Sequence, residues 1–262
     1  MEKSFYTADE ERWKEEFELR KKAAEYLKVP NGAKVLEILV GEADYGRIVA
    51  KYYNVEVISI EINENDIKNA KIKIKKDGLT NNVTILKRDV VGNKFPDNSF
   101  DYIINFIGWT DVTAYYGRQV VEKVIKETLR VLKENGTISI SFTPKIAPVD
   151  DISRKDIELQ NFMWVSEQRP EHFDEEFFIE LLKKHHVKIV KKHIITAKKS
   201  RINPKDAKGG IEWESLHCND WYPPDVKFRA PEEIFKKFSK HINKYGVPSH
   251  MNKIVLLIGN KM

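Results

Sequence analysis

A regular alternation of short apolar runs and longer amphipathic segments between residues 34 and 143 is the strongest constraint on this chain's fold. The apolar runs predict buried strands over residues 35–40, 55–60, 83–87, 100–107 and 137–142. Periodic segments between them predict helices over residues 44–53, 63–77 and 115–134. Strands that are apolar throughout and joined by helices predict an α/β fold, with a parallel sheet covered on both faces.

The rest of the chain follows this pattern less regularly. Helices are predicted over residues 9–28, 151–165, 174–186 and 232–245, and strands over 187–196 and 253–259. Residues 197–231 show little periodicity and contain breakers such as Gly209-Gly210 and Pro223-Pro224. We therefore expect a long irregular region there, in which the aromatic and titratable cluster Trp213–Tyr222 is a candidate substrate lid.

Composition excludes several classes of protein. The chain has 262 residues, enough for one large domain or two small ones. No apolar run approaches the roughly 20 residues that span a bilayer, so we expect no membrane segment. A single cysteine, Cys218, cannot form an internal disulfide, and the first residues lack an apolar secretory core. These features predict a cytoplasmic protein.

Basic residues are concentrated in one part of a chain whose net charge is only +5. Between Lys183 and Lys208, Asp206 is the one acid. Three interpretations stay open: a solvated surface, a surface that attracts a carboxylated or phosphorylated small acceptor, and an RNA-binding surface. Aromatic residues are not interleaved with the basic ones, which makes nucleic acid an unlikely partner.

Acidic residues mark the ends of three successive predicted strands: Glu37, Glu61 and Asp89. In open α/β sheets, ligands bind at the carboxyl ends of the strands, where the strand order reverses. A carboxylate after the second strand can accept hydrogen bonds from ribose hydroxyls, and one after the third can accept from the adenine amine. Any one of these acids could be an ordinary solvated loop residue, but three in register predict a nucleoside site.

The loop after the first strand indicates which nucleoside derivative fits. A dinucleotide site requires a glycine-rich turn and an open helix N-terminus for the pyrophosphate. Here the loop runs from Leu39 to Gly46 and carries Glu42 and Asp44, which would repel a pyrophosphate. S-adenosylmethionine has a sulfonium and an amino acid in place of phosphates, so it is the cofactor that the loop favours.

Three segments in consistent order resemble class I S-adenosylmethionine-dependent methyltransferases of the small-molecule branch. They read VLEILVGEA from Val35, FPDNSFDYI from Phe95 and ETLRVLKENGT from Glu127. The resemblance implies a Rossmann-like seven-stranded methyltransferase sheet with helices on both faces, an N-terminal helix and cap insertions.

The same resemblance implies a division of the chain into three parts. Residues 1–33 would form an N-terminal helical segment, residues 34–143 the cofactor-binding core, and residues 144–262 the rest of the sheet. Insertions at 144–172 and 197–250 would supply cap, substrate or oligomer elements, and a homodimer is one expectation.

Carried over position by position, the resemblance implies a set of cofactor-binding residues, which are Glu37, Gly41, Glu61, Ile62, Asp89, Val90, Asn105 and Ile107. Two departures stand out. Leu39 and Ala43 replace loop glycines of the family, and we expect Leu39 to shift the cofactor or narrow its slot. The fourth strand ends in Asn105-Phe106-Ile107-Gly108-Trp109, unlike the Asn-Pro-Pro-Tyr of enzymes that methylate amines on bases.

Aromatic residues after the fourth strand could form the acceptor site. An aromatic face favours a sulfonium, and Trp109 and Tyr116 are the candidate substrate-binding residues. Methyl transfer needs alignment and a deprotonated nucleophile, so Tyr115 and His217 are the candidate catalytic residues. No second cluster has ligand spacing for a metal, so none is expected.

In length and methanogen-like composition the chain is also similar to the pyridinol C-methyltransferases that help build the guanylylpyridinol cofactor of an iron hydrogenase. That similarity implies an archaeal enzyme of cofactor biosynthesis and a small, aromatic, carboxylated acceptor. Two alternatives stay open: an RNA methyltransferase, and a non-catalytic cofactor-binding or assembly protein suggested by the loss of loop glycines.

Overall fold

The computed structural model describes residues 10–145, 147–165, 175–198, 201–221, 227–248 and 253–262. Its helices are α1 (Glu10–Leu27), α2 (Asp44–Tyr53), α3 (Glu64–Lys76), α4 (Gly108–Val131), α5 (Asp151–Met163), α6 (Glu175–Lys184), α7 (Pro204–Trp221) and α8 (Pro231–Tyr245). Its strands are β1 (Lys34–Ile38), β2 (Glu56–Glu61), β3 (Val83–Lys87), β4 (Phe100–Ile104), β5 (Leu132–Phe142), β6 (Val187–Thr196), β7 (Arg201–Ile202), β8 (Val247–Pro248) and β9 (Lys253–Lys261).

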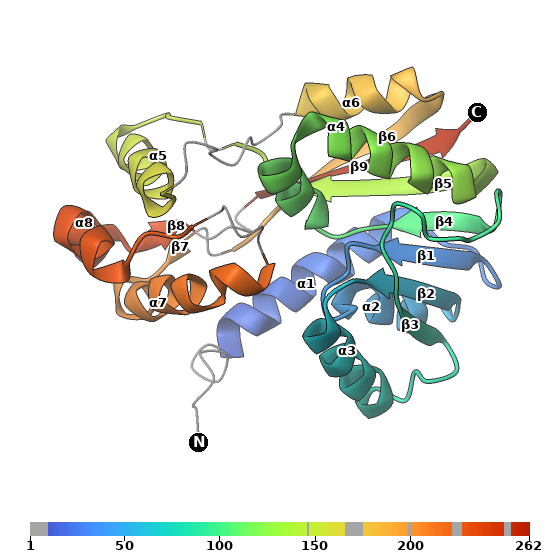
Figure 1. Cartoon of the computed structure of the whole chain (residues 1–262), viewed down its shortest axis with the longest axis horizontal. Coiled ribbons are helices and arrows are strands. Elements are labelled where there is room, and N and C mark those ends of the chain that lie inside the picture. The colour runs from blue at the N-terminus through green and yellow to red at the C-terminus, as the bar shows by residue number, and fades with distance from the viewer. Residues whose placement is uncertain (1–9, 146, 166–174, 199–200, 222–226, 249–252) are drawn as a thin grey trace.

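Seven strands form one sheet in the order β3-β2-β1-β4-β5-β9-β6 (Figure 1). The first five run parallel, whereas β9 is antiparallel to both of its neighbours, β5 and β6. The order reverses between β1 and β4, so the crevice at the carboxyl ends of these two strands is where the fold favours a ligand. The predicted α/β fold with a seven-stranded sheet is confirmed.

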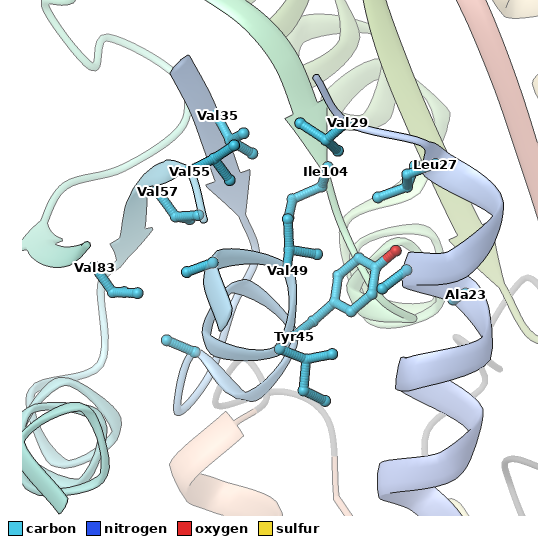
Figure 2. Packing of buried hydrophobic residues seen from close by; sticks show 14 of the residues in the cluster. Ala23, Leu27, Val29, Val35, Tyr45, Val49, Val55, Val57, Val83 and Ile104 are labelled. Carbon is cyan, nitrogen blue, oxygen red and sulfur yellow. The ribbon is translucent and has the colours of Figure 1, made fainter. Parts of the chain in front are cut away.

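Alternating side chains of the strands build a core on each face of the sheet. On β1, Val35 joins the core under α1, α2 and α3, whereas Leu36 and Ile38 join the core under α4 and α6. Figure 2 shows the first of these cores, in which Tyr45 of α2 points toward Ala23 of α1. Both faces are therefore dry, and only the strand ends can present polar groups to a ligand.

Outside the sheet, α5, α7, α8 and the two-stranded sheet of β7 and β8 enclose a third, smaller core. This unit lies to one side of the main sheet in Figure 1. A buried carboxylate holds it together: Asp156 of α5 forms an ion pair with Arg201 of β7 and accepts a 2.7 Å contact from His241 of α8. We call these elements the cap unit.

Two sequence expectations about this region and its neighbour are wrong. Most of the expected irregular region is helix α7, because Ala207 and Ile211 lie four residues apart and pack into the cap core. The helix predicted over 115–134 begins at Gly108, breaks at Gly117 and ends at Val131, and β5 begins at Leu132. Pairing of Leu132 with Phe100 draws the chain into the sheet before the Asn135-Gly136 stop signal is reached.

Candidate functional site

Glu37, in β1, is a buried carboxylate beneath the first loop (residues 39–43). One oxygen accepts the Gly46 N–H at 2.8 Å, and the other accepts the Ser59 hydroxyl at 2.6 Å. Gly46 is in the first turn of α2, and the residue preceding that helix, Ala43, has no side chain that could cap it. Glu37 therefore acts as the cap of α2 from an adjacent strand. Burial raises the pKa of Glu37 to about 7.

This capping also explains why the glycine at position 46 is required. A Cβ atom there would lie 2.3 Å from the Glu37 Oε2 atom. The carboxylate thus occupies the space at the helix N-terminus where a phosphate would bind in a dinucleotide site. Glu37 thus fixes the start of α2, the helix that follows the first loop, and its role in shaping the loop stays a prediction.

The first loop keeps a glycine-type backbone although it has only one glycine. Leu39, Gly41 and Ala43 all have left-handed φ angles, of 54°, 54° and 55°. These are the three positions at which the resemblance expects glycine. A residue with a Cβ atom costs roughly 1–2 kcal/mol in this conformation, so the surrounding fold holds Leu39 and Ala43 under strain. The two substitutions therefore change the side chains of the loop and leave its left-handed turns in place.

Glu61, at the end of β2, closes the loop from the other side. Its Oε2 atom accepts the Gly41 N–H at 2.9 Å, and its Oε1 atom accepts the N–H groups of Ile62 at 2.7 Å and Asn63 at 3.0 Å. Ile62 beside it is 58% exposed, which is unusual for a large apolar side chain. An anionic group and an exposed apolar side chain thus adjoin at the carboxyl end of β2.

The two acids of the first loop region are neutralised by neighbouring helices. Asp44 pairs with Arg47 at 2.8 Å and with Lys73 of α3 at 3.0 Å. Lys73 also pairs with Glu42, which accepts a hydrogen bond from Asn69 at 2.8 Å. These contacts join α3 to the start of α2, and both carboxylates remain partly exposed. Because Glu42 and Asp44 are paired with cations, they would repel a pyrophosphate less strongly than expected. The Glu37 carboxylate, which fills the space at the helix N-terminus, is the stronger obstacle to a pyrophosphate.

The end of β4 faces the first loop. The Asn105 amide is fully buried and donates to the Ile38 carbonyl at 3.0 Å, and its Oδ1 atom has no hydrogen-bond partner among the described residues. Ile107 has a φ of 71°, which is a strained value for a β-branched residue. Ser141 of β5 holds it there by accepting the Ile107 N–H at 2.9 Å. Strain is therefore concentrated on both sides of the switch point between β1 and β4.

Asp89 lies at the same edge of the sheet as Glu61. The Arg88 N–H donates to the Glu61 carbonyl at 2.9 Å, which extends the β2–β3 pairing to the residue before Asp89. The Asp89 carboxylate is exposed and accepts the Val91 N–H at 3.0 Å, forming a tight turn. Val90 is buried in the core and Val91 is 42% exposed. The structure thus brings the acids at the ends of β2 and β3 to one edge.

The residues expected to bind the acceptor or to act in catalysis are either buried in the core or outside the described side chains. Trp109 was expected at the mouth of the site, but it is 1% exposed and packs edge-on against Phe178 of α6, 6.0 Å between ring centroids. That expectation is wrong, because the start of α4 at Gly108 turns the indole into the core under α6. The side chains of Tyr115, Tyr116 and His217 lie outside the described part of the chain.

Three residues of this site were missed by the sequence analysis: Ser59, Ser141 and Gly46. Each acts through a contact with a residue far away in the chain. The available signal was weak but present, since Ser59 and Ser141 are polar residues inside apolar strand runs. Buried serines in such runs are expected to have hydrogen-bond partners.

Comparison with known proteins gives a family match in the first half of the chain. Residues 35–136 match the family described as a methyltransferase domain. The chain is 31% identical over 122 residues to the demethylmenaquinone methyltransferase of Listeria welshimeri, an alignment that covers 46% of this chain and 49% of that protein. The chain thus spans about half the length of the curated relatives it matches.

Solved structures extend the likeness to nearly the whole chain. The SpnF cyclase has a TM-score of 0.63 at 17% identity, and the match covers 94% of this chain and 80% of that one. Geranyl diphosphate methyltransferase in complex with S-adenosylmethionine has a TM-score of 0.56 at 10% identity, covering 94% and 85%. At these identities the likeness shows the fold alone, and it confirms the Rossmann-like methyltransferase fold.

Among the described helices, none is long and apolar enough to cross a bilayer.

Proposed function

We propose that this chain is an S-adenosylmethionine-dependent methyltransferase that acts on a small acceptor. The methyltransferase-domain match at residues 35–136 supports the class, and the structure offers a fitting site at the carboxyl ends of β1, β2 and β4. The observation that carries the proposal is the Gly41 to Glu61 hydrogen bond. It joins the left-handed first loop to Glu61, the carboxylate that would bind the ribose.

Each part of the cofactor would meet a different element. Glu61 would accept the ribose hydroxyls, Ile62 would cover a face of adenine, and Asp89 would accept from the adenine amine. Val90 would stand beside the ring. The first loop, with Gly41, would approach the amino acid tail, and Glu37 would support that loop from below.

The end of β4 would line the reacting centre. Asn105 and Ile107 lie opposite the first loop, and the unpartnered Asn105 oxygen is an acceptor suited to a cationic or N–H-bearing ligand. Methyl transfer breaks the bond between sulfur and the methyl carbon, leaves its electron pair on sulfur and forms a bond from the acceptor to that carbon. The protein supplies alignment and a proton acceptor, for which Tyr115 and His217 are our candidates.

For the acceptor we favour a small, aromatic, carboxylated molecule, of which a pyridinol cofactor precursor is one example. The relative from Listeria is named for demethylmenaquinone, a small molecule with a conjugated ring. Strand β6 points in the same direction as β5, so its carboxyl end lies at the edge of the sheet that carries the proposed site. The basic residues between Lys183 and Lys208 pass this edge at Lys198, which follows β6, and then enter the cap unit. Within the run, Lys184, Lys192 and Arg201 each contact a carboxylate, which disfavours a continuous RNA-binding face.

Calorimetry with S-adenosylhomocysteine tests the cofactor site. We expect binding by the wild type, a loss of more than tenfold in affinity for Glu61→Gln, and no change for Glu64→Gln, an exposed glutamate three residues further on. Equal affinities for the two variants would contradict the proposed site.

Labelled S-adenosylmethionine and a metabolite extract test the reaction. Mass spectrometry of the extract should show a small aromatic acid that gains one methyl group. Label that enters RNA instead would establish the RNA methyltransferase alternative. Binding without transfer to any molecule would establish the non-catalytic alternative.

A further inference from the structure

The connection between β3 and β4 is unusual for its place in the fold. It returns from the carboxyl end of β3 to the start of β4, past β2 and β1 in the sheet order. Connections of this kind between parallel strands usually contain a helix. Residues 88–99, all of which the structure describes, contain none. We call residues 88–99 the crossover segment. Because it contains no helix, other contacts must hold the turn that carries Asp89.

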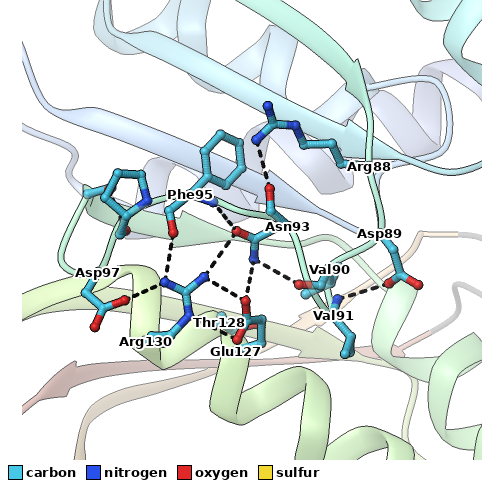
Figure 3. A network of polar contacts seen from close by, with 12 residues as sticks. Arg88, Asp89, Val90, Val91, Asn93, Phe95, Asp97, Glu127, Thr128 and Arg130 are labelled. Atoms are coloured by element: carbon cyan, nitrogen blue, oxygen red, sulfur yellow. Dashed lines mark hydrogen bonds and ion pairs between the residues drawn. The ribbon is translucent and has the colours of Figure 1, made fainter.

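Asn93 is the centre of that device (Figure 3). It is 3% exposed, and its side chain uses all of its hydrogen-bonding capacity. Its amide donates to the Val90 carbonyl at 2.9 Å and to Glu127 at 3.3 Å, and its oxygen accepts the Phe95 N–H at 2.8 Å and Arg130 at 3.4 Å. Asn93 thus joins the turn after β3 to helix α4.

Arg130 and Glu127 anchor this arrangement to α4. The Arg130 guanidinium forms two parallel bonds to the Glu127 carboxylate, at 2.7 and 3.0 Å, and donates to the Phe95 carbonyl at 2.8 Å. Arg88 closes the segment from the other side by donating to the Asn93 carbonyl at 2.8 Å. A bidentate pair between two residues on one helix is a rigid base, and each contact on it restricts the segment.

We propose that Asn93 is a positioning residue that sets the adenine-binding turn through the Val90 carbonyl, with Glu127 and Arg130 as its support. The inference rests on the proposed function, in which Asp89 accepts from the adenine amine. Val90 follows Asp89 directly, so the Asn93 bond to its carbonyl restrains the orientation of the Asp89 turn. Loss of that bond leaves the fold intact and allows the turn to rotate.

The test measures the ratio of affinities for an adenine-bearing and a hypoxanthine-bearing ligand. If Asn93 only stabilised the fold, its substitution would leave this ratio unchanged. Binding of S-adenosylhomocysteine is compared by calorimetry with binding of S-inosylhomocysteine, in which a carbonyl replaces the amine that Asp89 would meet. The wild type should prefer the adenosyl compound by about tenfold or more, since the carboxylate would face an oxygen in the other. Asn93→Ala should lose about tenfold in affinity for the adenosyl compound and bring the ratio close to one.

Two further variants keep the test independent of folding. Asn93→Asp has nearly the same volume and keeps the oxygen that accepts from Phe95, but it cannot donate to Val90 and should also lower the ratio. Leu27→Ala opens a cavity under α1, in the core on the other face of the sheet, so it should lower stability and leave the ratio unchanged.

Wild-type discrimination that Asn93→Ala and Asn93→Asp both retain would overturn the positioning role and leave the proposed function standing. A wild type that binds neither compound would overturn both.

Discussion

The first loop and the turn that opens the crossover segment lie at the same edge of the sheet but are held by different means. Left-handed backbone at Leu39, Gly41 and Ala43 shapes the first loop, and buried Glu37 caps the helix that follows it. Side-chain hydrogen bonds from Asn93 and Arg130 shape the crossover segment, whose residues 89–93 form its turn. The first loop is held in a strained backbone conformation, whereas the crossover segment, which contains no helix, is held by side-chain hydrogen bonds.

This difference teaches where each region tolerates change. A loop held by backbone conformation accepts new side chains, as Leu39 and Ala43 show, provided that the space beneath it is kept. The crossover segment also has left-handed backbone, at Gly92, Lys94 and Asn98, but it depends in addition on the identity of a few polar side chains. The predictions that follow separate these two cases, beginning with the largest effect.

Gly46→Ala should be the most destabilising change in the first loop region. The added methyl group would meet the Glu37 carboxylate at 2.3 Å, where neither the strand nor the helix can move freely. We expect a loss of about 4 kcal/mol in the free energy of unfolding, from overpacking together with the weakened cap. Urea denaturation measures this loss. Gly209→Ala in α7 is the control and should be neutral or stabilising, because alanine is favoured in a helix interior.

Glu37 should make the stability of the protein depend on pH. Its pKa in the folded state is about 7, above its ordinary value of 4.5, so the folded chain keeps this proton over a range where the unfolded chain has lost it. Stability should therefore fall by up to about 3 kcal/mol as pH rises from 4.5 to 7, and level off above that. Urea denaturation at a series of pH values should show this slope in the wild type.

Glu37→Gln should remove the slope, because glutamine does not titrate. Parallel curves for the two proteins would show that Glu37 titrates in the folded chain as it does in the unfolded one.

Arg130→Lys should weaken the crossover segment specifically. Lysine keeps the charge but cannot form the parallel bonds to Glu127 while also donating to the Phe95 carbonyl. We expect a loss of about 1.5 kcal/mol in stability, measured by thermal and urea denaturation. Arg154→Lys, in an exposed pair with Asp151 on α5, is the matched control and should change stability by less than about 0.5 kcal/mol. Equal losses of stability for the two variants would mean that the paired hydrogen bonds from Arg130 to Glu127 stabilise the protein no more than an exposed ion pair does.

Ala43→Gly should have the smallest effect. Glycine relieves the left-handed strain at this position, which offsets the loss of a buried methyl group and the greater freedom of the unfolded chain. The matched substitution Ala50→Gly, at a buried right-handed position in α2, has no such relief and should cost about 1 kcal/mol more. A cost for Ala43→Gly as large as that for Ala50→Gly would show that the first loop is not strained.

Much of the core could be predicted from the sequence because its signals are local. The apolar run from Val35 to Ile38 and the acid at Glu61 are read from neighbouring residues, and the structure places them as the fold class requires. Helix α7 was missed because, among its described side chains, the buried pattern is carried by Ala207 and Ile211, and these pack into the cap core that α5 and α8 complete. Trp109 was misplaced because only the packing of α6 decides which way the start of α4 turns.

The sequence alone therefore determined the α/β class, the strand ends that matter and the acids that mark them, since hydrophobic periodicity and turn chemistry act between residues close in the chain. Tertiary structure alone decided that Leu39 and Ala43 keep glycine-type backbone, that Glu37 caps α2, and that Asn93 braces the turn after β3. Each of these depends on atoms brought together from distant segments, where long-range packing can impose a conformation that local preference disfavours.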